Sequence, residues 1–191
     1  MDSVYFDSAL FLAIFNGEPN GPYIKALLTE LKRAHTKVHT SIITVQEISV
    51  LSFKSGTLVT DNHSKITKLA RIQGMSKEVA LTAAKLEAQM IDSAHSDPNP
   101  SDSKERELEN KRRKWDCFHI ATALELRCRT FYTADKRLLS LGERLKIKTM
   151  RFSEPVPSTL PLDLQGSLEI GNESKRIKSA EQKALPAPTE V

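Results

Sequence analysis

Four acidic residues lie far apart in the chain but occupy similar places beside predicted secondary structure. Asp7 directly follows the apolar, β-prone run SVYF, and Asp135 follows RTFYTA. Glu47 lies early in the helix predicted after the second strand, and Asp116 begins a predicted helix that follows a loop. Because ligands of an open parallel sheet bind outside the carboxyl ends of its strands, we expect the four carboxylates to converge at one edge of the domain.

Such a cluster of carboxylates predicts a metal site. Four carboxylates close together repel one another, and without a cation some of them would hold protons. Ligation by oxygen alone favours magnesium or manganese over zinc. Ions held in this way orient a phosphodiester, lower the pKa of an attacking water and stabilise the leaving oxygen. This mechanism needs no serine, cysteine or histidine nucleophile, and the sequence shows none arranged for that role.

Each acid on its own also has a structural explanation. Asp7 and Asp135 are suited to cap the helices that follow them, since aspartate is a favoured N-cap residue. Asp116 in a first turn is stabilised by the helix dipole, and Glu47 completes a capping-box pattern that begins at Thr44. Spacing alone leaves the catalytic and the structural interpretations about equally supported.

One basic run stands next to Asp116 in the sequence: Lys111, Arg112, Arg113 and Lys114. A charge run usually forms a solvated face, and contact with phosphates beside the metal is the less favoured interpretation. Trp115 and His119 are expected to be packing or surface residues without chemistry.

The predicted elements alternate between strands and helices. Strands are predicted at residues 3–6, 37–40, 130–132 and 147–152, and helices at 9–15, 23–34, 44–55, 76–91, 115–128 and 136–141. Gly56 and Gly142 are expected to end two of these helices, and residues 61–74 are predicted to be helical. Short apolar strands separated by helices indicate a parallel sheet. The fold class is therefore α/β, with a three-layer α/β/α architecture and a short-stranded, mainly parallel sheet.

Composition divides the chain into a domain and a tail. Residues 1–154 are predicted to form the domain, with a mobile polar insertion at 92–114 that has at most a helical end, and residues 155–191 a mostly unfolded tail. The formal charge of +4 and a pI of about 9.0 permit a polyanionic partner. Neither a signal peptide nor a membrane span is expected, which places the protein in the cytoplasm.

The motifs around the acids resemble a known family. VYFDSALFL, TSIITVQEI, WDCFHIATA and YTADKRL are together similar to the PIN domain, a metal-dependent nuclease fold typified by VapC toxins. Ser8 follows the first aspartate, and Thr133 stands in a Thr-x-Asp setting before the last one. The resemblance covers residues 3–152. The polar insertion and the tail depart from the compact family pattern.

The resemblance implies a function and a set of partners. It implies a parallel sheet of about five strands, a Mg²⁺ or Mn²⁺ site, and endonucleolytic cleavage of RNA, often by a homodimer restrained by an antitoxin. Its site residues correspond to Asp7, Glu47, Asp116 and Asp135, with Ser8 and Thr133 supporting the carboxylates. The alternatives are a catalytically weak PIN-like module that acts through protein or RNA binding, and a metal-dependent DNA nuclease or phosphatase.

Overall fold

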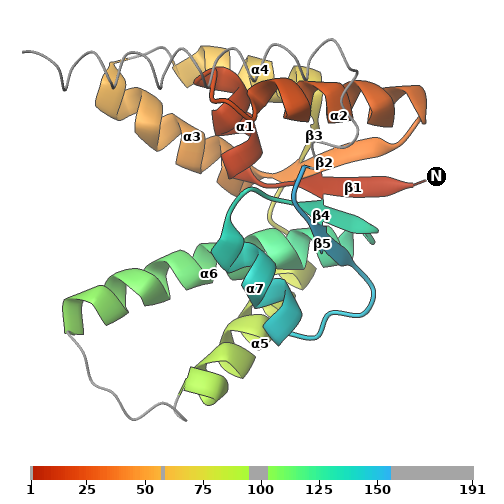
Figure 1. Cartoon of the computed structure of the whole chain (residues 1–191). Helices are drawn as coiled ribbons and strands as arrows, with labels where there is room; N and C mark the ends of the chain where they lie inside the picture. The colour runs from red at the N-terminus through yellow and green to blue at the C-terminus, as the bar shows by residue number, and fades with distance from the viewer. Residues whose placement is uncertain (1, 57–58, 95–102, 156–191) are drawn as a thin grey trace, which may run out of the picture.

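A computed structural model describes residues 2–56, 59–94 and 103–155 of the chain. Within these ranges five strands form one parallel sheet in the order β3-β2-β1-β4-β5 (Figure 1). The strands are β1 (Ser3–Phe6), β2 (Lys37–Ser41), β3 (Arg71–Gln73), β4 (Thr130–Tyr132) and β5 (Arg151–Ser153). Every pairing is parallel. All five carboxyl ends therefore lie at the same edge, as expected from the sequence.

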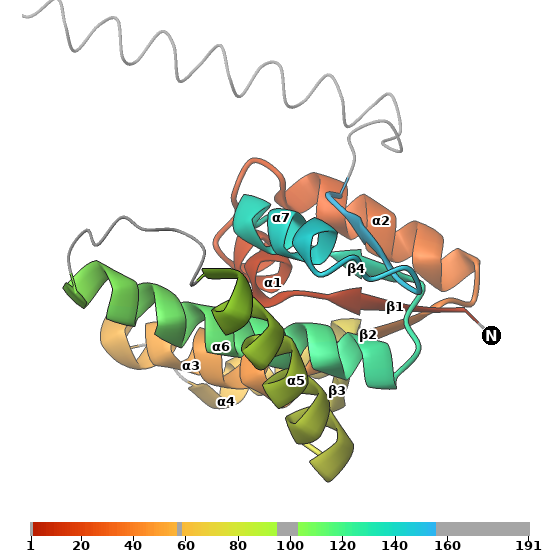
Figure 2. The same cartoon turned by 90° about the horizontal axis from the view of Figure 1, so that it is seen from below.

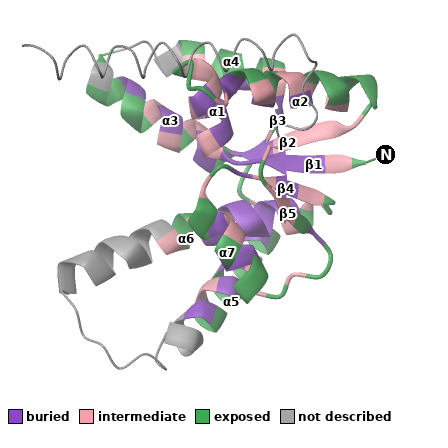
Figure 3. Cartoon of the chain, in the orientation of Figure 1, coloured by how far each residue is buried: buried purple, intermediate pink, exposed green. Residues whose placement is uncertain are grey.

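The central strand β1 divides the core into two halves. Val4 and Phe6 pack on one side with helices α1 (Ser8–Phe15), α2 (Gly21–Arg33), α3 (Ile42–Ser55) and α4 (Val59–Leu69). Tyr5 points to the other side, where α5 (Lys77–Ala94), α6 (Ser103–Glu125) and α7 (Lys136–Arg144) pack. Figure 1 shows these two layers above and below the sheet, Figure 2 shows the second layer from below, and Figure 3 shows β1 as mostly buried. The predicted α/β/α architecture is confirmed.

Two strands differ from the prediction. The segment predicted to be helical from 61 to 74 divides into α4 and the edge strand β3, which is only three residues long and too short for a recognisable period. The last strand begins at Arg151 instead of residue 147. Ile147 and Met150 are apolar because they pack against the α5–α7 core before the strand begins.

Helix α6 is longer than predicted. The polar segment from 103 to 114 continues directly into the helix that carries Asp116, and 92–94 belong to α5, so much of the expected loop is helical. Its glutamates, lysines and arginines have high helix propensity although they offer little to bury. Residues 95–102, the remainder of that loop, lie outside the described residues, as do 156–191 of the predicted tail. Asp116 is therefore well inside a helix instead of in a first turn.

The two glycines predicted to end helices behave differently. Gly56 ends α3 in the left-handed conformation with φ of 70°, where glycine avoids the steric penalty of a side chain. Gly142 lies inside α7, so its assignment as a helix end was wrong. A Cβ at Gly142 would meet the ring of Phe152 on β5. The glycine thus permits close approach of α7 to the sheet.

Within the described residues no helix is both long and apolar enough to cross a bilayer. Cys117 and Cys128 are both buried, and both are free thiols.

Candidate active site

Asp7 lies at the centre of the edge formed by the carboxyl ends of the strands. It follows β1 directly and only 3% of it is exposed. The Thr133 hydroxyl, one residue beyond β4, donates to Asp7 Oδ2 at 2.9 Å, and the Ser8 hydroxyl lies 3.4 Å from Oδ1. The backbone N–H of Asp7 donates to the carbonyl of Tyr132 at 3.1 Å. The strand pairing and the two hydroxyls together hold this carboxylate in a fixed place.

His119 contacts two of the predicted acids and is the residue that the sequence analysis missed. Its Nε2 lies 3.2 Å from Glu47 Oε2 and 3.9 Å from Asp7 Oδ1. Its Nδ1 lies 2.7 Å from the Tyr5 hydroxyl and 3.3 Å from the hydroxyl of Ser41, the last residue of β2. The side chain is only 1% exposed. The expectation that it has no chemistry overlooked its spacing from Asp116, since residues three apart on a helix are neighbours.

The charges of Asp7 and Asp116 interact. Burial raises the pKa of Asp7, against the opposing effects of His119 and the Thr133 hydrogen bond. Burial followed by the nearby charge of Asp7 raises the pKa of Asp116 to about 6. These carboxylates are close enough together, and far enough from water, for each additional negative charge to be unfavourable.

Glu47 and His119 stabilise each other as an ion pair. Burial alone would raise the pKa of Glu47, but its hydrogen bond and charge interaction with His119 outweigh burial and lower the pKa. Burial also opposes the charged form of His119, yet the hydrogen bond to Glu47 and the charges of Asp7 and Asp116 leave the pKa of the imidazole raised. The positive imidazole thus offsets part of the negative charge of the cluster.

Asp135 combines a capping role with membership of the acidic edge. Its Oδ1 accepts the backbone N–H of Arg137 at 2.8 Å, which caps α7. The Arg137 guanidinium also pairs with Oδ2 at 2.8 Å, and these bonds lower the pKa of Asp135. Asp135 still acts on Asp116, whose pKa it helps to raise.

The capping explanation fails for the other three acids. Asp7 is the N-cap residue of α1 but makes no side-chain cap bond. Helix α3 begins at Ile42, two residues before the expected capping box, so Glu47 does not contribute to its N-terminus. Asp116 lies thirteen residues into α6, beyond the reach of the helix dipole.

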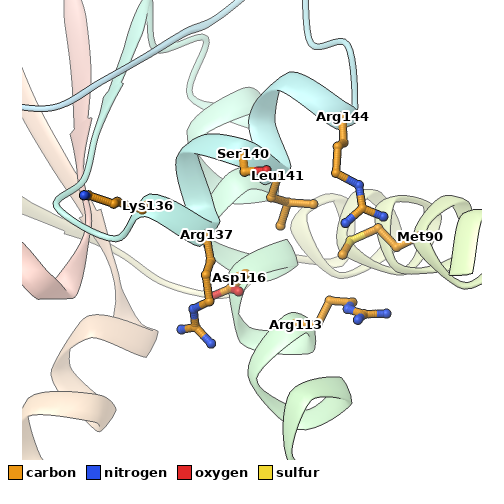
Figure 4. A pocket seen from close by; sticks show the side chains of 8 residues that line it. All are labelled: Met90, Arg113, Asp116, Lys136, Arg137, Ser140, Leu141 and Arg144. Carbon is orange, nitrogen blue, oxygen red and sulfur yellow. The ribbon is translucent and has the colours of Figure 1, made fainter. Parts of the chain in front are cut away.

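A pocket of about 300 Å³ opens beside Asp116. Its lining comes from α5, α6 and α7: Met90, Arg113, Asp116, Lys136, Arg137, Ser140, Leu141 and Arg144 (Figure 4). Arg113, which belongs to the predicted basic run, therefore lies at the pocket beside Asp116. Lys114 is exposed and does not line the pocket. The side chains of Lys111 and Arg112 lie outside the described residues.

The donor set of this edge fits a divalent cation in chemistry. Besides burial, the charges of Asp7 and Asp135 raise the pKa of Asp116, and the charge of Glu47 raises that of Asp7. Carboxylates in this relation are stabilised by a cation, and oxygen ligands suit Mg²⁺ or Mn²⁺. In the described part of the chain, however, no three His, Cys, Asp or Glu side chains are already grouped to ligate one ion. Glu47 is bound to His119 and Asp135 to Arg137, so a cation has to compete with these partners.

The fold agrees with a comparison to known protein families. The family model of the PIN domain matches residues 4–143. The chain belongs to the PIN domain family. Members of this family are nucleases, which makes the acidic edge the candidate active site of a hydrolase that acts on nucleic acid. No curated protein sequence matches the chain.

Solved structures of VapBC proteins share the fold at low identity. VapBC2 from Rickettsia felis, bound to a DNA fragment from its promoter, has a TM-score of 0.54 and 14% identity over 80% of this chain and 98% of the other. DNA-bound VapBC from Salmonella typhimurium has a TM-score of 0.53 and 13% identity over 82% of this chain and 100% of the other. VapBC-1 from nontypeable Haemophilus influenzae has a TM-score of 0.52 and 12% identity over 80% of this chain and 98% of the other. These likenesses show the shared fold.

Proposed function

We propose that this PIN domain is a Mg²⁺- or Mn²⁺-dependent endoribonuclease whose metal is held by Asp7, Glu47, Asp116 and Asp135. The observation that carries the proposal is the buried position of Asp7 beside Asp116, whose pKa it helps to raise. Asp7 is buried at the end of the central strand and Asp116 on α6 is half-buried beside it, and such carboxylates destabilise the protein unless a ligand uses them. Catalysis by a bound cation explains why they are there.

The surrounding side chains position the carboxylates. Thr133 and Ser8 orient the two oxygens of Asp7, and His119 orients Glu47 through Nε2. Asp116 is ionised above about pH 6, its own pKa, and so can accept a cation at neutral pH. A divalent cation, when bound, supplies a water of lowered pKa and neutralises charge on the phosphodiester. Such supporting hydrogen bonds typically affect metal affinity by 10–100-fold.

The biological partners follow from the fold and the charge. RNA is the proposed substrate, with the basic run Lys111, Arg112, Arg113 and Lys114 contacting phosphates without reading sequence. An antitoxin is a proposed partner, because three structures that share the fold are VapBC proteins. A homodimer is proposed from the resemblance to the PIN family alone. A cytoplasmic location is consistent with RNA as the substrate and an antitoxin as the partner.

A second candidate is a binding module with weak or no catalysis. It is favoured by the ion pair between Asp135 and Arg137, which occupies one of the four carboxylates. It is also favoured by the lack of a ready-made group of metal ligands in the described residues. In this case the protein binds nucleic acid or protein, and adding Mg²⁺ does not raise the rate of cleavage.

Cleavage assays separate the candidates. The full chain is incubated with single-stranded and structured RNA in Mg²⁺, Mn²⁺ or EDTA, and single-stranded DNA and a small phosphoester compete as substrates. We expect metal-dependent cleavage of RNA that Asp7→Asn and Asp116→Asn abolish. Asp61→Asn, at an exposed acid of α4 paired with Lys65, serves as the matched control and keeps full activity. Cleavage by either site variant at the wild-type rate eliminates the proposed mechanism, and preference for DNA or the phosphoester reassigns the substrate.

A further inference from the structure

The pocket beside Asp116 carries a concentrated positive charge. Four of its eight lining residues are cationic, namely Arg113, Lys136, Arg137 and Arg144, whereas Asp116 is its single acid. Asp135 balances part of this charge through Arg137. Two apolar side chains, Met90 and Leu141, form part of the wall. A surface of this composition attracts an anion.

The cations come from two helices that the fold brings together. Arg113 lies on α6, three residues and about one turn before Asp116, while Arg137 and Arg144 lie on α7. In Figure 4 the Arg113 and Arg144 side chains reach toward the Met90 side of the pocket, and Arg137 lies next to Asp116. The amine of Lys136 points away from them. Three guanidinium groups therefore surround the pocket, and guanidinium is the side-chain group best matched to phosphate oxygens.

Asp116 connects the pocket to the acidic edge. The charges of Asp7, His119, Arg137 and Asp135 all act on its carboxylate. A substrate phosphate held among the acids is therefore adjacent to the arginine pocket. The pocket also opens to solvent between exposed residues of α7, because Arg137, Ser140 and Arg144 are all exposed. A continuous polyanion can pass from one place to the other.

We propose that Arg113, Arg137 and Arg144 bind a backbone phosphate of the nucleic acid next to the phosphodiester that is cut. This inference rests on the proposed function for the position of the cut, but binding of the phosphate does not itself require cleavage. It assigns the pocket the role of fixing the strand relative to the acids. Because the bound group is a phosphate, the pocket contributes affinity and register without base specificity.

The test removes two charges from the pocket and leaves Arg137, the partner of Asp135, in place. The double variant Arg113→Gln and Arg144→Gln is compared with Lys32→Gln and Arg33→Gln, which removes two charges from the exposed end of α2. Binding of a fluorescent single-stranded RNA is measured in EDTA at several salt concentrations. Both variants have the same reduction in net charge, so a general electrostatic effect is equal in the two.

Binding of a backbone phosphate has three expected signatures. The pocket variant binds about tenfold more weakly or worse, and its plot of log Kd against log salt concentration becomes shallower by about 0.7 for each phosphate of a single strand that is no longer neutralised. The α2 variant stays close to wild type. Finally, neutral methylphosphonates replace the backbone phosphates of the RNA one at a time. At one position next to the cut, the replacement weakens RNA binding by the wild type but not by the pocket variant.

Three results would overturn the inference. They are an equal decrease of affinity in both variants, an unchanged salt dependence, and a methylphosphonate scan with no position at which the effect depends on the arginines. A pocket that binds a terminal phosphate instead gives a defect only with a 5′-phosphorylated oligonucleotide and not with the same strand ending in a hydroxyl, which also overturns the backbone assignment. Failure of the proposed function is distinct: the wild type then binds with the expected signatures but does not cleave.

Discussion

The Tyr5 hydroxyl and His119 Nδ1 lie 2.7 Å apart inside the core, and the opposite nitrogen of the same imidazole lies 3.2 Å from Glu47. Tyr5 belongs to the central strand and is fully buried, with its ring stacked on Phe131 at a centroid distance of 4.8 Å. The centre of the sheet is thus connected through one ring to a carboxylate of the acidic edge. The orientation of Glu47 therefore depends in part on Tyr5, through His119.

Removing the Tyr5 hydroxyl tests this connection. We expect Tyr5→Phe to raise the Mg²⁺ or Mn²⁺ concentration needed for half-maximal cleavage by about tenfold, because His119 loses a partner that fixes its ring. Tyr132→Phe, on the side of the sheet covered by α1–α4, is the matched control. Metal titrations of cleavage and of thermal unfolding provide the measurements. A decrease of stability with unchanged metal dependence would assign the hydroxyl a purely structural role.

The raised pKa of Asp116 predicts an unusual dependence of stability on pH in EDTA. The pKa is about 6 in the folded protein and near 3.9 in an unfolded chain, so between these values the folded state binds more protons. The contribution of Asp116 to the free energy of unfolding therefore falls as pH rises from about 4 to about 6. Asp116→Asn removes this penalty.

Denaturant unfolding of wild type and Asp116→Asn in EDTA measures the effect. The variant should be the more stable protein at pH 7, with the difference shrinking toward pH 4. Mg²⁺ should then stabilise the wild type more than the variant, because only the wild type retains the full set of carboxylates. A difference that does not change with pH would show that Asp116 is not buried beside other charges.

Thr133 supports two acids at once, since its hydroxyl donates to Asp7 and accepts the backbone N–H of Asp135 at 2.9 Å. We expect Thr133→Val to lower metal affinity by about 10–100-fold and the free energy of unfolding by about 1–3 kcal/mol, because it leaves buried polar groups without this partner. Thr29→Val, at an exposed helical threonine whose hydroxyl donates to the Lys25 carbonyl of its own turn, should change neither. Calorimetric titration with Mn²⁺ and urea unfolding test both effects.

The two roles of Asp135 can be separated by a pair of substitutions. Asparagine is as good an N-cap as aspartate, whereas alanine costs about 1 kcal/mol of stability. Asp135→Asn should therefore keep the free energy of unfolding close to wild type but lose cleavage. Asp135→Ala should lose cleavage and also lower the free energy of unfolding. If Asp135→Asn cleaves RNA as fast as the wild type, the residue is only a helix cap.

Gly142 tests the close packing of α7 on β5. Alanine favours a helix by about 1 kcal/mol over glycine, but at this position its Cβ would enter the ring of Phe152. Overpacking of this kind costs about 1–3 kcal/mol, so we expect a net decrease of stability for Gly142→Ala. Gly74→Ala is the control, since nothing lies within 4 Å of a Cβ there. Equal stability of the two variants would mean that Phe152 moves aside freely.

The sequence predicts the parts of this fold that carry a strong pattern. SVYF, an apolar run ending at an acid, and the stripe of α6 around Ile120 and Ala121 both place their elements correctly, because burial imposes the pattern. The three-residue strand β3 has no period to detect. The polar start of α6 was expected to be a loop because its residues have little to bury, although their propensity favours a helix.

The candidate site was predictable at the level of strand ends but not of side-chain partners. Asp7 and Asp135 follow strands that the sequence indicates. Because these strands are parallel neighbours, both residues lie at the same edge of the sheet. The link between His119 and Glu47 joins residues 72 positions apart and exists only through packing of α3 against α6. Likewise, Arg113 of α6 and Arg144 of α7 line the same pocket only because of how α7 packs beside α6.

The order of strands in the sheet has a consequence for synthesis of the protein on the ribosome. Asp7 is made first, yet the β1 strand that carries it pairs with β4, and its carboxylate bonds to Thr133, more than 120 residues later. A nascent chain that has not yet reached this region has the first acid without its partners. The acidic edge can form only after nearly the whole domain has emerged, so an unfinished polypeptide lacks the assembled candidate site.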